Sequence, residues 1–409
     1  MTAELTRLAN GVTVAVDPMA GAQSASIGLY AAVGSRSEPD GQGGLAHLVE
    51  HMVFKGAGGR DARAIAEAIE NVGGSLNAWT ARDQTVFHAR TLAADVGLAL
   101  ELIASLVRSP RLDEAELERE KLVILSELGE CLDTPDDLIH DRLFEAAFGQ
   151  QPLARPVLGC ETSIRSLTRA DCANWLDQQY RPERLVIAAA GKVDPGHVLL
   201  LAEALFGDLP HGQLPAVAPA RFEGGARPDR RASEQTHLAF AYPGLPAADP
   251  AAPALSLFAQ AVGGGMSSRL FQDLREERGL AYSIYAWTQG FADTGIFAVN
   301  LSTDKARAAE AMELARGTVE RAAEDLSEAE LARARAQVEA ALLMALETPQ
   351  GRADSMARSI EVFGRIMTLD EMLAELRAVE TAAARQAACA MLAGPRAAAS
   401  IGGSLALAA

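Results

Sequence analysis

Residues 43–56 read GGLAHLVEHMVFKG, a segment that combines an apolar helix pattern with three ionisable side chains. Apart from His47, Glu50 and His51, the residues between the flanking glycines are apolar, and we expect them to be buried on nearly every side. Ionisable groups in such surroundings need partners, because an unpaired charge in an apolar interior is costly. The two imidazoles and the carboxylate therefore require a common explanation.

The spacing of these three residues fits a metal site. On a helix, His47 and His51 are four residues apart and lie on one face about 6 Å from each other, close enough to bind one ion. Glu50 neighbours the same face, so its carboxylate can reach a metal-bound water without being a ligand. The order H-x-x-E-H is the inverzincin pattern. Fewer than about 0.02 random matches are expected for this composition.

A zinc site needs a third protein ligand and usually keeps its fourth position for water. The segment ELEREKLVILSEL, residues 116–128, offers Glu120 and Glu127, which lie seven residues apart on one face of an amphipathic helix. Their spacing alone favours an ordinary solvated helix face over a ligand position. Both interpretations stay open at this point.

Composition limits the classes of protein. A chain of 409 residues is too long for one ordinary core and suggests two domains of roughly 200 residues. With 49% hydrophobic and 22% charged residues it is a typical globular chain. The net charge of −17 makes nucleic acid and anionic membranes poor partners and favours basic peptides or metal cations. An acidic surface that only aids solubility is the alternative.

The cysteines and the N-terminal segment indicate the compartment. Four scattered cysteines with no C-x-x-C pair favour reduced thiols over disulfides or a cysteine zinc site. The first residues have no apolar signal-peptide core, and no apolar run is long enough to cross a bilayer. We therefore expect a cytoplasmic protein that does not bind membranes.

Hydrophobic periodicity predicts a mixed fold. Strands are expected at 11–16, 25–33, 75–81, 85–91 and 185–191, and helices at 62–72, 93–108, 113–131, 136–147, 168–179 and after Pro195. The two strands at 75–81 and 85–91 form a hairpin pattern. Because strands and helices do not alternate strictly, the pattern indicates an α+β fold with mostly antiparallel sheets and helices packed on one face.

The second half of the chain repeats the first. AWT occurs at 78–80 and 286–288, LDEAEL at 112–117 resembles LSEAEL at 326–331, and the strand ending at Gly191 is matched by a segment ending near Gly402. Three matches in one order with offsets of 208, 214 and 211 indicate a duplicated domain. A proline- and glycine-rich stretch separates the copies. We predict domains at 1–212 and 234–409, with a linker at 213–233.

The duplication supplies an internal control for the polar cluster. With an offset of 208, the second copy has Leu255, Phe258 and Ala259 at the positions of His47, Glu50 and His51. With an offset of 214, it has Ala334 and Ala341 at the positions of Glu120 and Glu127. All five counterparts are apolar. The architecture therefore does not need the polar cluster to fold. We infer that one copy retains it for chemistry.

The chain closely resembles the pitrilysin-type metallopeptidases, in particular bacterial relatives of the mitochondrial processing peptidase β subunit. The resemblance covers almost the whole chain and rests on GGLAHLVEHMVFKG, GGSLNAWTARDQTVF, EREKLVILSELGECLDTPDD and GGGMSSRLFQDLREERGLAYSIYAW followed by DTGIF. In that family the third zinc ligand is a glutamate about 76 residues after the second histidine, which corresponds to Glu127. The resemblance places Glu120 behind the ligands, where it orients a ligand histidine.

The resemblance implies a zinc-dependent endopeptidase with one Zn²⁺ per chain. Zinc held by His47, His51 and Glu127 would lower the pKa of its bound water from 15.7 toward about 7. Glu50 would act as general base and later protonate the leaving amine. Arg275 and Tyr282 match the family's arginine–tyrosine pair, which stabilises the oxyanion. The residues alone favour an ion-paired Arg275 and a Tyr282 buried in the core.

Substrate binding and assembly are also implied by the resemblance. A substrate peptide would add to the strand SLNAWTA, with its main chain bound by Asn77 and Ala78. The acidic net charge leads us to expect basic peptide segments as substrates. The family works as paired two-domain chains that enclose a clamshell chamber, and this chain carries both the zinc motif and the arginine–tyrosine pair. We therefore expect a homodimer with shared active sites.

Two alternative classes remain. The first is a noncatalytic scaffold or partner subunit of a processing-peptidase-like or respiratory complex, and the complete zinc and base positions argue against it. The second is metal binding without turnover. Metal content measured together with peptide hydrolysis would separate them.

Overall fold

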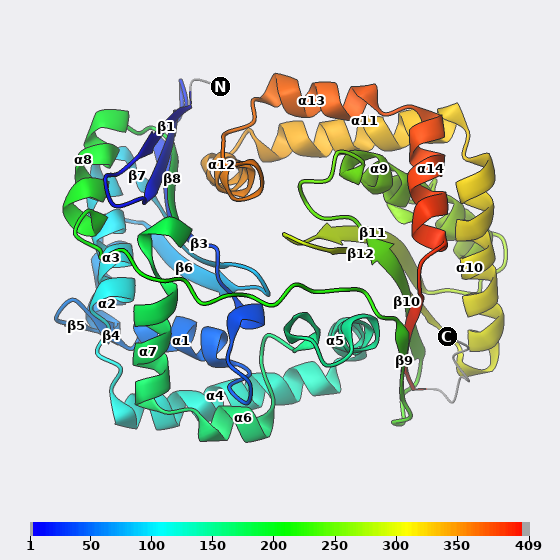
Figure 1. Cartoon of the computed structure of the whole chain (residues 1–409), viewed down its shortest axis with the longest axis horizontal. Coiled ribbons are helices and arrows are strands. Elements are labelled where there is room, and N and C mark those ends of the chain that lie inside the picture. The colour runs from blue at the N-terminus through cyan, green and yellow to red at the C-terminus, as the bar shows by residue number, and fades with distance from the viewer. Residues whose placement is uncertain (1–2, 403–409) are drawn as a thin grey trace. The chain divides into compact units, whose positions relative to one another are not determined.

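The computed structural model describes residues 3–402 and divides into two compact units, each built around one sheet (Figure 1). Unit 1 comprises Met1–Gly129, Pro156–Ala218 and Leu343–Thr368, and unit 2 comprises Glu130–Arg155, Pro219–Leu342 and Leu369–Ala409. Both units mix strands and helices, which confirms the predicted α+β class with two related halves.

The sheet of unit 1 has six strands in the order β1-β2-β8-β3-β7-β6. Their bounds are β1 Glu4–Arg7, β2 Thr13–Pro18, β3 Ser24–Ala31, β6 Ser75–Thr80, β7 Thr85–Leu92 and β8 Leu185–Gly191. Only the β2–β8 pair in this sheet is parallel. Since β6 is the last strand in the order, its outer edge has no partner strand among the described residues. This confirms the predicted hairpin and places β6, which contains most of SLNAWTA, at the edge of the sheet.

The sheet of unit 2 has five strands in the order β11-β12-β10-β13-β9. Their bounds are β9 Gly225–Asp229, β10 Thr236–Gly244, β11 Ser283–Gly290, β12 Gly295–Thr303 and β13 Ala397–Ile401. The order matches β6-β7-β3-β8-β2 of unit 1 strand for strand, and β13–β9 repeats the single parallel pair. The two AWT segments occupy β6 and β11. The fold therefore repeats as the sequence predicted.

Most helices of each unit pack on one face of its sheet. In unit 1 these are α1 Leu45–Val53, α2 Ala62–Glu70, α3 Val96–Arg108, α6 Glu161–Ser166, α7 Arg169–Gln179 and α8 Pro195–Phe206, together with most of α4 Glu114–Asp133. In unit 2 they are α9 Ala252–Gly263, α10 Ala308–Asp325, α13 Leu369–Ala378 and α14 Thr381–Leu392, with most of α11 Glu328–Ala345. Asp61 caps α2 by accepting the Ala64 amide at 2.8 Å.

Each unit also contains one helix from the opposite half of the chain. The helix α5, Pro135–Phe148, contacts β13, β10 and β9 in unit 2, and α12, Pro349–Phe363, contacts β8, β3 and β2 in unit 1. In unit 1, α12 covers the second sheet face, where Ala15, Tyr30 and Ala188 pack against Ala353 and Met356. A helix thus lies on the face opposite the main helical layer.

The predicted domain limits differ from the observed units in these two segments. The chain passes from unit 1 to unit 2 after Ala218, inside the predicted linker at 213–233, but β9 in that linker is a strand of the second sheet. The segments 130–155 and 343–368 belong to units other than those the linear limits 1–212 and 234–409 assign them. Residues 403–409 of the predicted second domain lie outside the described residues.

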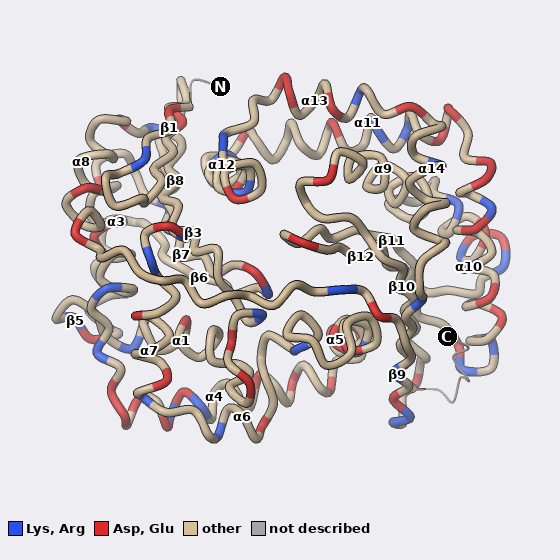
Figure 2. The backbone as a smooth tube through the Cα atoms, in the orientation of Figure 1, with Lys and Arg blue, Asp and Glu red and all other residues tan. Residues whose placement is uncertain are grey.

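Charged side chains are interspersed along the surface helices. Figure 2 shows Asp and Glu interleaved with Lys and Arg along α10 and α11. This arrangement is typical of solvated helix faces rather than of a basic stripe for nucleic acid. Among the described residues, no helix has both the length and the apolarity needed to span a membrane.

Candidate metal centre

The helix α1 presents the H-x-x-E-H motif because its other face is fixed in the core. Leu45, Leu48, Val49 and Met52 are at most 1% exposed and belong to the core of unit 1. His47, Glu50 and His51 therefore lie on the remaining, partly buried face. The helical spacing predicted from the sequence is confirmed.

The start of α1 is held by a buried carboxylate and a glycine. Glu38 is 4% exposed and accepts the amides of Gly44 at 3.1 Å and Ala46 at 2.8 Å. A carboxylate at this end satisfies amides that the helix leaves unpaired and complements the helix dipole. Gly44 has φ +88°, and a Cβ there would lie 2.7 Å from the Leu158 carbonyl oxygen. Both contacts fix the helix that carries the histidines.

The helix α4 brings two acidic residues to this face, although Glu120, the nearer in sequence, lies 69 positions after His51. Leu117 and Ile124 are 3% and 0% exposed and anchor α4 in the core. Glu120 and Glu127 project from the same side of the helix toward α1. His51 Nδ1 lies 2.8 Å from Glu120 Oε1, and Glu127 Oε2 lies 3.8 Å from His51 Nε2 and 3.9 Å from His47 Nε2.

The resulting geometry fits a tetrahedral zinc site. His47, His51 and Glu127 each offer one donor atom, and these atoms lie within 4.8 Å of one another; the two histidine Nε2 atoms are 3.2 Å apart. Zinc bound to nitrogen and oxygen at about 2.0–2.2 Å requires donor separations of roughly 3.3–3.6 Å. The separations of 3.2, 3.8 and 3.9 Å lie just below and just above that range, so small side-chain shifts would bring the three donors to it. With its Nδ1–H donated to Glu120, His51 directs the lone pair of Nε2 at the neighbouring imidazole. At 3.2 Å the two Nε2 atoms can share a metal cation, or a proton on His47 Nε2 when no metal is bound.

Burial sets the protonation of the site. Burial, with a contribution from the neighbouring His51, lowers the pKa of His47 to about 4, so the imidazole is neutral and able to bind a metal at pH 7. Burial also raises the pKa of Glu50, while a hydrogen bond from Thr80 opposes that rise. The Thr80 hydroxyl donates to Glu50 Oε2 at 2.5 Å. Electrostatic interaction with His51 lowers the pKa of Glu50, and interaction with Glu127 raises it.

Glu120 and Glu127 differ in burial. The Glu120 side chain is 5% exposed and is shared between His51 and Lys55, whose Nζ lies 2.7 Å from Glu120 Oε2. The Glu127 side chain is 39% exposed and lies on the open side of the imidazoles. A buried carboxylate that grips Nδ1 orients a ligand, and an accessible one beside the Nε2 atoms can bind the ion.

The predicted peptide-binding strand borders this centre. In β6, Ser75, Asn77 and Trp79 are exposed, and the alternate residues face α1 and α2. The Ala78 amide donates to the Asn77 side-chain oxygen at 2.9 Å. Sequence analysis did not identify Thr80, which the same alternation places on the helix side of β6, or Lys55, which lies four residues after His51.

The remaining predicted pair lies in unit 2. Arg275 belongs to the π-helical turn Phe271–Glu276, and its guanidinium lies 4.8 Å from the centre of the Phe271 ring. Tyr282 is 53% exposed and donates its hydroxyl to Asp304 at 3.1 Å. Tyr282 therefore does not fill the core, and both side chains are available at the surface of their unit.

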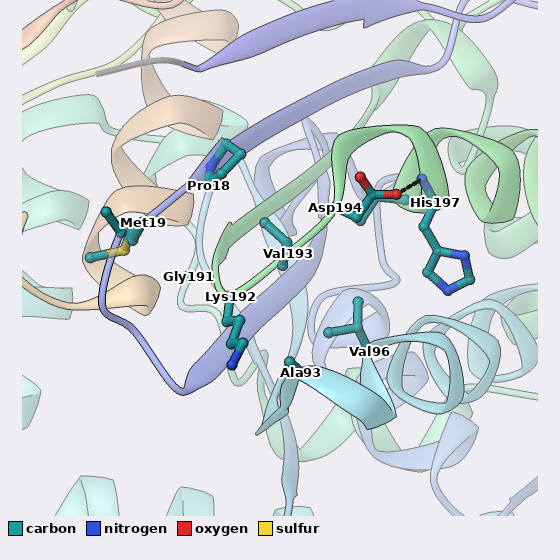
Figure 3. Close-up of a pocket in the computed structure, with 11 residues that line it drawn as sticks. Pro18, Met19, Ala93, Val96, Gly191, Lys192, Val193, Asp194 and His197 are labelled. Atoms are coloured by element: carbon teal, nitrogen blue, oxygen red, sulfur yellow. Dashed lines mark hydrogen bonds between the residues drawn. The ribbon is translucent and has the colours of Figure 1, made fainter.

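A separate hollow of about 760 Å³ lies in unit 1 between the ends of β2 and β8 and the starts of α3 and α8 (Figure 3). It shares no residue with the metal cluster. Asp194, one of its lining residues, accepts the His197 amide at 2.8 Å and serves as the cap of α8. Its other lining residues are apolar apart from Lys192 and His197.

Comparisons with known proteins agree with the fold and identify a peptidase family. The family model described as Insulinase (Peptidase family M16) matches residues 13–161, and that described as Peptidase M16 inactive domain matches residues 166–338. An uncharacterized zinc protease of Streptomyces coelicolor is 34% identical over 388 residues, covering 92% of this chain and 84% of that protein. An uncharacterized zinc protease of Rickettsia bellii is 35% identical over 372 residues, covering 90% of each.

Solved structures share the fold. A protease from Helicobacter pylori superposes with a TM-score of 0.90 at 21% identity, covering 98% of this chain and 99% of the other. A Pseudomonas fluorescens structure described as a peptidase M16 inactive domain gives a TM-score of 0.91 at 23% identity, covering 99% of each. The resemblance found in the sequence is thus confirmed, and the chain belongs to the pitrilysin-type or insulinase family of peptidases, peptidase family M16.

Proposed function

We propose that this chain is a zinc-dependent endopeptidase that hydrolyses peptides or unfolded polypeptide segments, with Glu50 as its general base. The observation that carries the proposal is the convergence of His47 Nε2, His51 Nε2 and Glu127 Oε2. Relatives that are named zinc proteases over nearly the full chain support it. The model described as inactive matches residues 166–338, whereas all three proposed ligands lie within the 13–161 match.

Each residue of the centre has a distinct task. Zinc bound there would supply a Lewis acid that polarises water and the scissile carbonyl. His47 and His51 provide neutral nitrogen donors, and Glu120 holds the His51 ring in place through Nδ1. Glu50 accepts the proton of the attacking water and returns it to the leaving amine. Burial of Glu50 raises its pKa and so makes the carboxylate a better base.

The substrate would bind as an added strand. The outer edge of β6 offers the Ala78 amide, which the Asn77 side chain occupies in the peptide-free protein. Such binding reads the peptide main chain and leaves side-chain selectivity weak. Because the net charge is −17, we expect faster cleavage of basic peptides than of matched acidic peptides at low salt, and equal rates would contradict this preference.

One pair of variants tests the central proposal. Purified Glu50→Gln should retain zinc and lose about 10²–10⁴-fold in hydrolysis of a quenched peptide, because only the proton acceptor is removed. Glu127→Ala should lose both zinc and hydrolysis. Glu114→Gln on the same helix is a suitable control, since that residue is exposed. Wild-type protein that binds zinc without cleaving any peptide would refute the enzymatic assignment.

We further propose that the protein works as a homodimer in which Arg275 and Tyr282 complete the partner's site. Both side chains are exposed in their unit and available to contact a substrate. Mixing Glu50→Gln protein with Arg275→Ala protein should regenerate one complete site in each mixed dimer. Recovery of activity on mixing supports shared sites, and the absence of recovery in verified mixed dimers contradicts them.

A further inference from the structure

The general base is tied to the edge strand by a single hydroxyl. Thr80 is the last residue of β6, and its Oγ1 donates to Glu50 Oε2 at 2.5 Å across 30 positions of sequence. Both side chains are partly buried. A hydrogen bond to a charged acceptor in such surroundings is shorter and stronger than one between neutral groups. It occupies one oxygen of the carboxylate and leaves the other for the reacting water.

The hydroxyl is held in place by the sheet. Thr80 pairs with Thr85 across the hairpin, and the Ala81 amide closes the turn on the Gln84 carbonyl at 2.7 Å. The Thr85 side chain is fully buried and donates to the Val33 carbonyl at 2.9 Å. A β-branched side chain also has few rotamers at χ1. The donor therefore has little freedom to leave Glu50 while β6 keeps its register.

The second copy of the domain shows whether threonine occurs at this position only because it suits a β-strand. Thr288 in β11 occupies the position of Thr80 in the repeated AWT segment, and Phe258 stands where the first copy has Glu50. Phe258 is fully buried and cannot accept a hydrogen bond. A threonine at this position therefore fits the strand in both copies, and only the first copy pairs it with a carboxylate.

We propose that Thr80 is a positioning residue that aligns Glu50 and couples the base to the peptide-binding strand. The inference rests on the proposed function and adds a residue to it. A peptide that adds to the outer edge of β6 orders the same strand that holds the carboxylate, so binding and base alignment are linked. Loss of the hydroxyl should thus reduce turnover more than substrate binding.

Steady-state kinetics of the zinc-loaded enzyme test this role. In Thr80→Val, which keeps the shape and removes the donor, we expect kcat for a quenched peptide to fall about 10–100-fold. KM and zinc content should remain within about twofold of wild type, because neither the ligands nor the strand edge is altered. Thr80→Ser should recover most of kcat, and Thr288→Val should match wild type.

A metal-free measurement gives an independent readout. Thr80→Val should lower the Tm of the chelated protein in the wild-type background and have a smaller effect in the Glu50→Ala background, because the acceptor is already gone. Equal Tm losses in both backgrounds overturn the inference. So does a Thr80→Val enzyme with wild-type kcat, or a Thr80→Ser enzyme as impaired as Thr80→Val. An inactive wild-type enzyme overturns the proposed function and this inference together, whereas an active wild type with an unaffected Thr80→Val overturns this inference alone.

Discussion

The buried ion pair between Asp17 and Arg352 should be a main contribution to holding α12 on the sheet of unit 1. Asp17 in β2 is fully buried, and its Oδ2 accepts from the Arg352 guanidinium of α12 at 2.9 Å. The other oxygen, Oδ1, has no hydrogen-bond partner among the described residues. Arg352 is the charge that compensates this carboxylate, and it also donates to the Leu346 carbonyl at 2.7 Å.

Arg352→Met should therefore be strongly destabilising. The substitution keeps most of the apolar stem but leaves a carboxylate without its counter-charge in the interior, which costs about 3–5 kcal/mol. The Arg352 side chain is 26% exposed, so water screens the pair in part and we expect about 3 kcal/mol. For a unit of this size each kcal/mol shifts Tm by about 2–4 °C. The predicted loss in Tm is about 6–12 °C, measured by calorimetry at pH 7.

Two controls decide whether burial is the cause. Arg63→Met breaks an ion pair with Glu67 on α2 in which the side chains are 86% and 51% exposed, so it should cost less than about 0.5 kcal/mol. Adding Asp17→Ala to Arg352→Met removes the stranded charge and should recover part of the lost Tm. The reasoning is refuted if Arg352→Met shifts Tm no more than Arg63→Met, or if the double variant loses the sum of the two single losses.

Three further predictions concern charges. Lys55→Met should weaken zinc binding about 10–100-fold in a chelator competition, because Lys55 secures the Glu120 carboxylate that orients His51, and Lys55→Arg should retain most of the affinity. Burial lowers the pKa of His47 from 6.5 to about 4, so as the pH falls the unfolded chain protonates this imidazole before the folded chain does. The metal-free fold should therefore lose stability between about pH 6.5 and pH 4, and His47→Ala should flatten that part of a Tm–pH curve. The hydrogen bond from Arg269 lowers the pKa of Glu330 to about 2, so Glu330→Gln should lower the free energy of unfolding by about 1–3 kcal/mol at pH 7. Urea titrations should show this difference between variant and wild type shrinking as the pH falls from about 4.5 to 2.

Local patterns carried most of the fold prediction. Alternation and helical periodicity depend on which faces of a segment are buried, so β6, β7, β8 and α3 lie close to the predicted ranges. The exchange of α5 and α12 was not predictable in this way, because a helix pattern shows which side is apolar but not which sheet covers it. The strand β9 was missed since it contains Pro228 and pairs with β13, about 170 residues later in the chain.

The candidate site also contains residues that a local sequence pattern predicts and residues that only tertiary packing brings together. The histidine pair follows from one helical turn and was readable from the sequence. The choice between Glu120 and Glu127 depends on how α4 packs beside α1, which spacing alone left open. Their side chains are 5% and 39% exposed, which supports the proposed roles of Glu120 in orienting His51 and of Glu127 as the third ligand. Thr80 gave no signal because threonine is common in strands, and its significance appears only when Glu50 is found opposite it.

The duplicated fold shows what the metal centre requires of its unit. In α9 the matching positions carry Leu255, Phe258 and Ala259, which are at most 3% exposed and complete an apolar core. In α1 the same positions leave His47 Nδ1 buried without a hydrogen-bond partner among the described residues. A sequence selected only for stability would replace this cluster by residues of the α9 kind. That the first copy has kept two imidazoles and a carboxylate, and has placed Glu38, Glu120 and Thr80 around them, indicates that the cluster is maintained by its chemistry.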